Sequence, residues 1–279
     1  MNKRMLFLFC AFLLVVAMFL TFLGNVSLEL NSYTISDSDL PTTFDGYRVA
    51  HISDLHNTRM GKNNEDILEI LREARPDIIA ITGDLIDSRN TDVSIALEFA
   101  EEAMKIAPCY YVAGNHEARI PEYEKFKKEL AALGVMVLEN DSLEIERSDE
   151  KIALVGVNDP SFETDPLQDD AAVMSEVLKN LVRDDLYSIL LSHRPELFET
   201  YVKSGANLVL SGHAHGGQFR LPLLGGLFAP HQGFFPQYDA GLFSKQNTNM
   251  IVSRGIGNSL FPFRINNRPE IILIILKAA

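Results

Sequence analysis

Cysteine is scarce in this sequence of 279 residues, which contains only Cys10 and Cys109. Cys10 lies inside an apolar N-terminal run and Cys109 begins an expected strand, so the two thiols are in environments too different for pairing. A disulfide framework is therefore excluded. This absence does not place the protein in the cytosol, because a well-packed domain of this size needs no such crosslink.

The sequence also lacks clusters of Lys and Arg, and its formal net charge is -13. Proteins hold the phosphate backbone of nucleic acids with such clusters, so we expect no nucleic-acid partner. The acidic charge does not exclude a phosphorylated substrate, because bound cations can reverse the sign of the charge inside a site.

Internal repeats, low-complexity tracts and flexible linkers are absent after residue 40. With 47% hydrophobic and 23% charged residues, the composition is that of an ordinary folded protein. We therefore expect a single domain over residues 31–279.

The longest apolar run extends from Met5 to Leu23 and follows two basic residues, Lys3 and Arg4. As a helix this run would reach roughly 28 Å, about the thickness of a bilayer core. A cleaved signal peptide usually has a shorter apolar region and a better cleavage site than this one. We therefore expect residues 1–30 to form an uncleaved anchor with one transmembrane helix. The positive-inside rule then places the rest of the chain on the extracytoplasmic side of the cell membrane.

The remainder alternates between strand and helix patterns, which predicts an α/β fold at the front and mostly strands at the back. Pro76 and Gly134 mark the ends of two of the helices. Helices are predicted over 67–74, 93–104, 123–133, 174–181 and 195–205. Strands are predicted over 47–53, 78–82, 110–112, 143–146, 151–157, 188–192, 208–211, 250–253 and 270–276.

Residues that can bind metals follow five of the predicted strands directly. Ligands gather at the carboxyl ends of strands in open α/β sheets, so these residues are expected to meet at one edge. The five groups are Asp54-x-His56, Gly83-Asp84, Gly114-Asn115-His116-Glu117, His193 and Gly212-His213-Ala214-His215-Gly216-Gly217.

Each group has an ordinary structural explanation when it is taken alone. Asp-x-His and Gly-Asp are common in turns, Asn115 could cap a helix, and His193 could begin one. Gly-His-Ala-His-Gly-Gly is the most specific group, because its glycines permit close backbone approach and its histidines point the same way from an extended chain. Five such groups in this order favour a metal site.

The five groups resemble the complete motif set of the calcineurin-like metallophosphoesterases, in the same order. Residues 216–218 and 253–257 are similar to a bacterial, membrane-associated branch of that family. The resemblance implies a four-layer α-β-β-α sandwich, in which helices flank two packed mixed sheets.

The resemblance also implies two divalent cations, seven ligands and one catalytic histidine. One ion would be held by Asp54, His56 and His215. The other would be held by Asn115, His193 and His213, with Asp84 bridging both. His116, beside a ligand, would stabilise the transition state or protonate the leaving oxygen. Mixed nitrogen and oxygen ligands suit Mn, Zn or Fe.

These features predict a phosphoesterase that acts on a phosphorylated small molecule or a lipid-linked substrate. The substrate would be a phosphodiester, a phosphomonoester or a nucleotide-sugar pyrophosphate of the UDP-diacylglucosamine type. Two alternatives stay open, a non-catalytic metal-binding scaffold of the same fold and a phosphoprotein phosphatase.

Five further residues have two interpretations each. His51 lies within a strand and is expected to be structural. His231 lies in a loop near the apolar residues 221–228, which either pack in the core or form a wall beside the metals that receives a lipid chain or faces the membrane. A guanidinium binds phosphate in a bidentate manner, so three arginines are candidates for holding a substrate phosphate: Arg119, Arg254 and Arg264.

Overall fold

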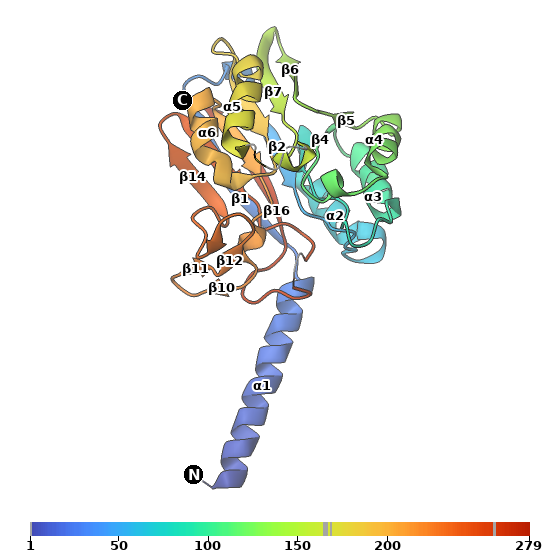
Figure 1. Ribbon diagram of the computed structural model, residues 1–279, viewed down its shortest axis with the longest axis vertical. Coiled ribbons are helices and arrows are strands. Elements are labelled where there is room, and N and C mark those ends of the chain that lie inside the picture. Colours follow the sequence, from blue (N-terminus) through green and yellow to red (C-terminus); the bar gives the residue numbers. More distant parts are fainter. Residues whose placement is uncertain (1, 164–166, 168, 259–260) are drawn as a thin grey trace.

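The computed structural model describes residues 2–163, 167, 169–258 and 261–279. Its N-terminal helix, α1 (Lys3–Val26), projects from one end of the molecule as a long rod (Figure 1). Within the residues described, no helix combines the length and the hydrophobicity that crossing a membrane requires. The predicted helix is thus present, but the predicted membrane span is not found.

The first sheet has six strands in the order β1-β16-β2-β3-β4-β5. Its neighbours are parallel except for the antiparallel pair of β16 and β2. The strands are β1 (Glu29–Asp37), β2 (Arg48–Ile52), β3 (Ile78–Thr82), β4 (Cys109–Val112), β5 (Met136–Val137) and β16 (Glu270–Ala278).

The second sheet also has six strands, in the order β14-β15-β9-β8-β7-β6. It is parallel at its centre and has an antiparallel strand at each edge. The strands are β6 (Asp141–Arg147), β7 (Glu150–Gly156), β8 (Ser188–Leu191), β9 (Leu208–Ser211), β14 (Gly241–Lys245) and β15 (Thr248–Val252). Two small hairpins lie apart from both sheets: β10 (Arg220–Leu221) with β11 (Gly225–Gly226), and β12 (Phe228–Ala229) with β13 (Gly233–Phe234).

Helices cover the outer face of each sheet. The helices beside the first sheet are α2 (Glu65–Ala74), α3 (Ser94–Met104) and α4 (Tyr123–Ala132), and those beside the second are α5 (Asp170–Leu181) and α6 (Phe198–Ser204). A third apolar cluster joins the two sheets face to face. The layers are therefore helices, sheet, sheet and helices, as the family resemblance implies.

Strand β3 shows why the central strands are apolar throughout. Side chains alternate between the two faces of a strand, and both faces of this sheet are covered. Ile79 and Ile81 pack under the helices, whereas Ile78 and Ala80 face the other sheet. With both faces buried, the strand ends are the places where polar side chains can leave the core.

Candidate metal centre

The site residues leave the ends of strands in both sheets. Asp54 and His56 follow β2, Asp84 follows β3, and Asn115 and His116 follow β4. From the second sheet, His193 follows β8, whereas His213 and His215 follow β9. All eight residues are buried, with at most 9% of their surface exposed.

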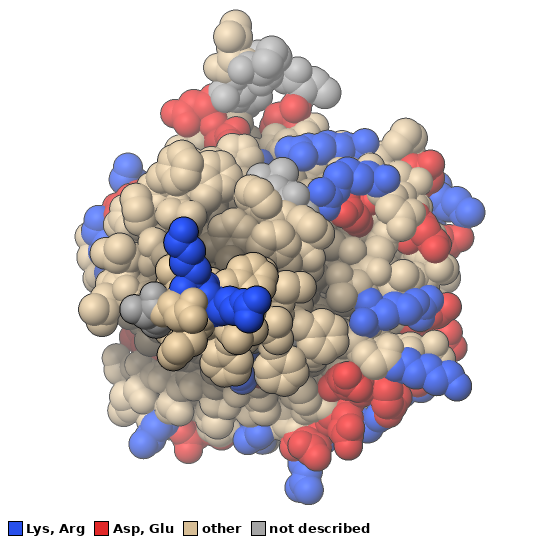
Figure 2. All heavy atoms as spheres, turned by 90° about the horizontal axis from the view of Figure 1, so that it is seen from below, with Lys and Arg blue, Asp and Glu red and all other residues tan. Residues whose placement is uncertain are grey.

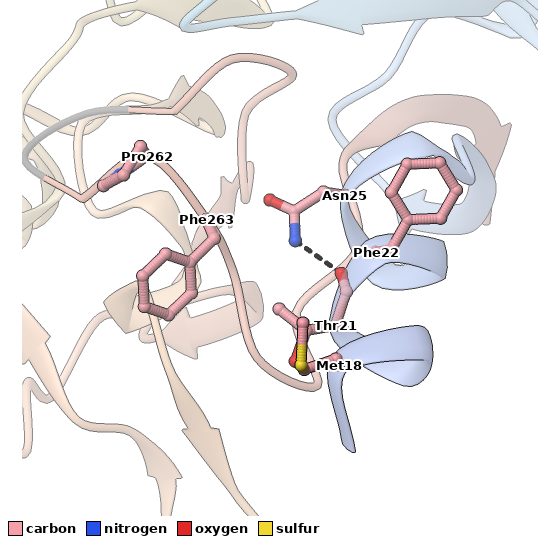
Figure 3. A pocket seen from close by; sticks show the side chains of 6 residues that line it. All are labelled: Met18, Thr21, Phe22, Asn25, Pro262 and Phe263. Carbon is pink, nitrogen blue, oxygen red and sulfur yellow. Dashed lines mark hydrogen bonds between the residues drawn. The ribbon is translucent and has the colours of Figure 1, made fainter. Parts of the chain in front are cut away.

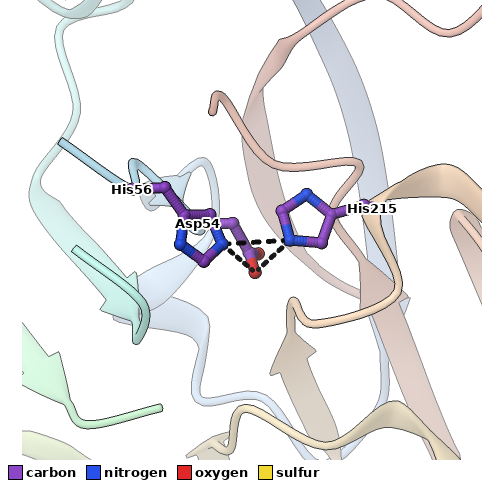
Figure 4. Close-up of side chains that lie close together, drawn as sticks. All are labelled: Asp54, His56 and His215. Atoms are coloured by element: carbon purple, nitrogen blue, oxygen red, sulfur yellow. Dashed lines mark hydrogen bonds and ion pairs between the residues drawn. The ribbon is translucent and has the colours of Figure 1, made fainter. Parts of the chain in front are cut away.

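Three residues form the first cluster, as Figure 4 shows. Nε2 of His215 lies 3.2 Å from Oδ1 of Asp54 and 3.1 Å from Nε2 of His56. Nε2 of His56 is 3.8 Å from the same carboxylate oxygen. The three ligand atoms thus converge on one point.

The second cluster contains His193, His213 and Asn115. Nε2 of His193 lies 3.2 Å from Nδ1 of His213 and 3.2 Å from Oδ1 of Asn115. The other ring nitrogen of His193, Nδ1, donates to the carbonyl of Thr82 at 2.7 Å. This bond leaves Nε2 available as a ligand, which is how metal-binding histidines are commonly oriented.

Asp84 joins the two clusters through one oxygen. Its Oδ2 lies 3.2 Å from Nε2 of His193 and 3.6 Å from Nε2 of His56. Its other oxygen, Oδ1, accepts from the backbone N–H of His116 at 2.8 Å. The carboxylate is thereby fixed between the clusters.

The electrostatics of the centre favour cations. Burial opposes the charge on Asp84, but His193 and His56 outweigh it and hold the pKa of this carboxyl well below its usual range. Burial also lowers the pKa of His56 to about 3, so that its imidazole is neutral. Burial would lower the pKa of His193 as well, but Asp84 and then Asp54 raise it to about 10. The neutral imidazole of His56 beside ionised carboxylates suits a divalent metal, and the positive charge that these carboxylates favour at His193 would be supplied by a bound cation in place of the proton.

His116 lies beside this centre rather than inside it. Its Nε2 is 4.0 Å from Oδ2 of Asp84, and its ring meets that of His56 edge-on at 4.5 Å. Its Nδ1 accepts from the backbone N–H of Ser88 at 3.0 Å. Burial lowers the pKa of His116, and because Nδ1 accepts this hydrogen bond, a proton on the singly protonated ring lies on Nε2, the atom that faces the centre.

The backbone of the centre is strained. Asp54, His56, Asp84, His213 and His215 all have φ between 46° and 66°, a region that non-glycine residues rarely adopt. Such conformations persist only where the surrounding structure enforces them, and they gather at functional sites.

Two glycines give the carboxylates their space. A Cβ at Gly212 would overlap Ser53 Oγ and Asp54 Oδ2, and one at Gly114 would overlap Oδ1 of Asp84. These positions explain why Gly precedes the ligands in both motifs.

The carboxylate of Glu117 holds two of these loops together, and this role was not predicted from the sequence. Glu117 accepts from the backbone N–H groups of Asp84, Ile86 and Gly114 at 2.8, 3.1 and 2.8 Å. Burial, followed by the charge of Asp84, raises its pKa to about 7. Its only signal in the sequence was its place directly after His116.

A second missed feature is the contact between His213 and His231. Nε2 of His213 lies 2.9 Å from Nδ1 of His231, and Oε1 of Glu196 is 3.8 Å from the same nitrogen. These three residues form a further cluster of potential metal ligands beside the centre. The loop of His231 therefore reaches the site, in agreement with one of the two interpretations of this loop, although the contact made by the imidazole itself was not predicted.

The three candidate arginines differ in their surroundings. Arg254 forms ion pairs with Glu29 and Glu270 at 2.8 and 2.9 Å. Arg264 is buried and donates to the carbonyls of Arg254 and Gly257. Both guanidinium groups are therefore engaged within the fold, whereas Arg119 is exposed.

His51 has the surroundings of a structural imidazole. It is buried, and its Nε2 is hydrogen-bonded to Thr82 Oγ1 at 2.7 Å. This contact lies within the first sheet, as expected from its place in a strand.

Two packed sheets that carry linked clusters of His, Asp and Asn at a shared edge define a metal-dependent hydrolase. The family model of calcineurin-like phosphoesterases matches residues 47–217. The chain belongs to this family and is a dinuclear metal-dependent phosphoesterase.

Relatives support this assignment over most of the chain. Metallophosphoesterase YkuE of Bacillus subtilis (strain 168) is 30% identical over 90% of this chain and 86% of its own length. Phosphodiesterase YaeI of Escherichia coli (strain K12) is 28% identical over 82% of each chain. A Danio rerio protein named "Transmembrane protein with metallophosphoesterase domain" is 29% identical, and the match covers 86% of this chain and 55% of that protein.

The fold also matches a solved structure. The crystal structure of TT1561 of Thermus thermophilus aligns over 75% of this chain and 90% of that chain, with a TM-score of 0.53 and 15% identity. This likeness supports the mixed α/β fold of two packed sheets with flanking helices.

Proposed function

We propose that the two clusters hold two divalent cations and that this centre hydrolyses a phosphoester. Asp54, His56 and His215 hold one ion, and Asn115, His193 and His213 hold the other. The observation that carries the proposal is Asp84, whose Oδ2 lies within 3.6 Å of ring nitrogens from both clusters. A carboxylate in this position can bridge two ions.

The residues divide the chemistry between them. When bound, the ions polarise the phosphoryl oxygens and lower the pKa of a water that attacks phosphorus. Asn115 contributes an uncharged oxygen, so it does not reduce the positive charge of the centre. Nε2 of His116 faces the centre, where its N–H would stabilise the transition state by donating a hydrogen bond or, from the protonated ring, would transfer a proton to the leaving oxygen.

Hydrolysis of bis-p-nitrophenyl phosphate with added Mn²⁺ tests the proposal. Asp84→Ala should lose bound metal and activity together, because it removes the bridge. His116→Ala should keep its metal but lose roughly 10²- to 10⁴-fold in kcat, as expected when a proton donor is removed.

Asp185→Ala is the matched control, because Asp185 is an exposed carboxylate outside the centre. A purified, metal-loaded protein that is inert toward every phosphoester in a panel would contradict the proposal. It would favour the non-catalytic scaffold instead.

We propose further that the substrate lies at a membrane and is a lipid-linked phosphoester or a nucleotide-sugar pyrophosphate. The apolar residues of α1 support attachment to a membrane, and the basic Lys3 and Arg4 at its start support an extracytoplasmic centre. Two vertebrate relatives carry "Transmembrane protein" in their names.

Separation of membranes from soluble fractions, with and without an alkaline wash, tests the attachment. Release of the full chain by the wash would contradict it.

A further inference from the structure

Large apolar side chains are exposed mainly in α1 and in three short segments near its end. The β10–β12 region lies at the end of the molecule from which α1 projects (Figure 1). We call the exposed residues of these segments the apolar collar. They are Leu221, Leu223, Leu224, Phe234, Phe235, Phe261, Phe263 and Ile265.

The collar is strongly exposed and has almost no charged neighbours in the sequence. Leu223 is fully exposed and Phe234 is 73% exposed. Residues 221–238 and 255–263 contain no Lys, Arg, Asp or Glu, although 23% of the whole chain is charged. Figure 2 shows the same pattern on the surface, where uncharged residues surround α1 and charged residues lie mostly toward the rim. A patch of this kind marks an interaction surface.

Hydrogen bonds and ring contacts hold together two of the three collar segments, residues 221–224 and 261–265, through residues 218–220. The side chain of Gln218 donates to the carbonyls of Phe261 and Phe263 at 3.2 and 2.9 Å. The backbone N–H of Arg220 donates to the carbonyl of Ile265 at 3.0 Å. The ring of Phe219 packs against the rings of Phe261 and Phe263 at 5.1 and 5.5 Å. The exposure of these apolar residues is therefore built into the fold.

The collar is also joined to α1. The side-chain amide of Asn25 accepts from the backbone N–H of Arg264 at 2.8 Å and donates to its carbonyl at 3.1 Å. Between α1 and the collar is a pocket of about 520 Å³, which Figure 3 shows. Its lining is mainly apolar and consists of Met18, Thr21, Phe22, Asn25, Pro262 and Phe263.

We propose that the collar docks into the acyl layer of a phospholipid membrane and that lipid chains enter the pocket beside α1. Lipid is favoured over a protein partner because the collar continues the apolar surface of α1 without a charged boundary and presents no charge pattern that a protein would complement. The inference rests on the proposed membrane attachment but not on the hydrolysis. It also places the metal centre next to the lipid surface, because His231, between two collar segments, contacts His213.

The absence of tryptophan from the chain provides a clean test. Single-tryptophan variants of the full-length protein can be reconstituted into phosphatidylcholine vesicles with brominated acyl chains, which quench only tryptophans in the acyl layer. Leu223→Trp and Phe234→Trp report on the collar, and Phe12→Trp reports on α1. Met136→Trp is the matched control, because Met136 is 52% exposed and lies in β5 at the far edge of the first sheet.

The collar variants should show blue-shifted emission and several-fold stronger quenching than Met136→Trp. Quenching of Phe12→Trp alone would overturn the collar proposal and leave the membrane attachment intact. Absence of quenching in the two collar variants and in Phe12→Trp would overturn both the collar proposal and the membrane attachment. A blue shift of the collar variants without quenching, dependent on protein concentration, would show that a second copy of the chain covers the collar and would also overturn the proposal. Phosphoester hydrolysis takes no part in this measurement, and circular dichroism of each variant verifies that it is folded.

Discussion

At the scale of single residues, the imidazole of His213 is the most informative case. Its Nδ1 faces the second cluster, whereas its Nε2 faces His231. A histidine that binds a metal through one nitrogen usually needs a partner at the other, which fixes its tautomer and orientation. We therefore predict that His231 positions the His213 imidazole for metal binding.

Replacement of His231 by Phe should weaken metal binding by roughly 10- to 100-fold, the usual effect of removing such a partner. Titration calorimetry with Mn²⁺ or Zn²⁺ measures this change without reference to activity. His231→Asn, which can still accept a hydrogen bond, should recover part of the affinity.

The neighbouring residue provides the control for that experiment. Gln232 bonds to the backbone of Tyr238, and none of its described hydrogen bonds reaches the centre. Gln232→Ala should therefore bind metal as the unaltered protein does. Equal affinities for His231→Phe and the unaltered protein would show that His213 is oriented by other contacts.

The sequence predicted which residues meet at the centre but not what supports them. Residue types that bind metals can be recognised directly after strands, because the strand pattern is local and the carboxyl ends of the strands gather ligands at one edge of the sheet. Glu117 and His231 could not be assigned in this way, because their roles depend on which loops the fold brings beside them. The metal-ligand roles themselves stay a prediction.

At the scale of elements, a buried ion pair fixes the segment that follows β8. Arg194 donates from Nε and Nη2 to the two oxygens of Asp159 at 2.5 and 2.8 Å. Each residue is 2% exposed. Burial opposes the charge on Asp159, but Arg194 lowers the pKa of this carboxyl below its usual value. Because Arg194 follows His193, the pair also orients a candidate ligand.

Asp159→Asn should lower the free energy of unfolding by roughly 3 kcal/mol, because the buried Arg194 guanidinium loses its bidentate anion and keeps only Glu196, at 3.1 Å, as a carboxylate partner. The chain offers a control with the same geometry at the surface. Arg183 donates from Nε and Nη2 to the two oxygens of Asp185 at 2.9 and 2.7 Å, with both side chains exposed. In urea unfolding, Asp185→Asn should behave like the unaltered protein. Similar decreases in the free energy of unfolding of both variants would show that burial does not determine how strongly the ion pair stabilises the protein.

Helices and strands with a clear periodicity were predicted well. The predicted helices over 67–74 and 93–104 correspond to α2 (Glu65–Ala74) and α3 (Ser94–Met104), and the strand over 78–82 is β3 (Ile78–Thr82). The short strands β10 to β13 were not predicted, since two-residue strands carry no periodic signal. Their pairing depends on contacts that only the folded chain provides.

At the scale of the whole molecule, the centre ties the two sheets together. The loops after β2, β3 and β4 supply some of the candidate ligands, and those after β8 and β9 supply the others. An ion that binds ligands from both sheets can do so only in the folded protein. Metal binding should therefore stabilise the folded state relative to the unfolded chain.

Removal of metal by a chelator should therefore lower the melting temperature. At a metal concentration of about 100 times Kd, the stabilisation is about 2.7 kcal/mol per ion. For a chain of this size that corresponds to a shift of roughly 5–10 °C. Differential scanning calorimetry of the metal-loaded and chelated protein measures the shift, and Asp84→Ala should show much less of it. Identical melting temperatures with and without chelator would contradict a resident metal centre.

The strand that follows α1 has a mechanical consequence. β1 runs parallel to the last strand, β16, over nine paired positions from Glu29↔Glu270 to Asp37↔Ala278. Only two residues, Ser27 and Leu28, separate it from α1. Parallel ladders have evenly spaced hydrogen bonds. A pulling force applied through α1 along this strand would load them in shear, so that they would have to break together rather than unzip one by one. The first and last strands of the chain thus form a clamp that resists extraction of the N-terminal helix by force.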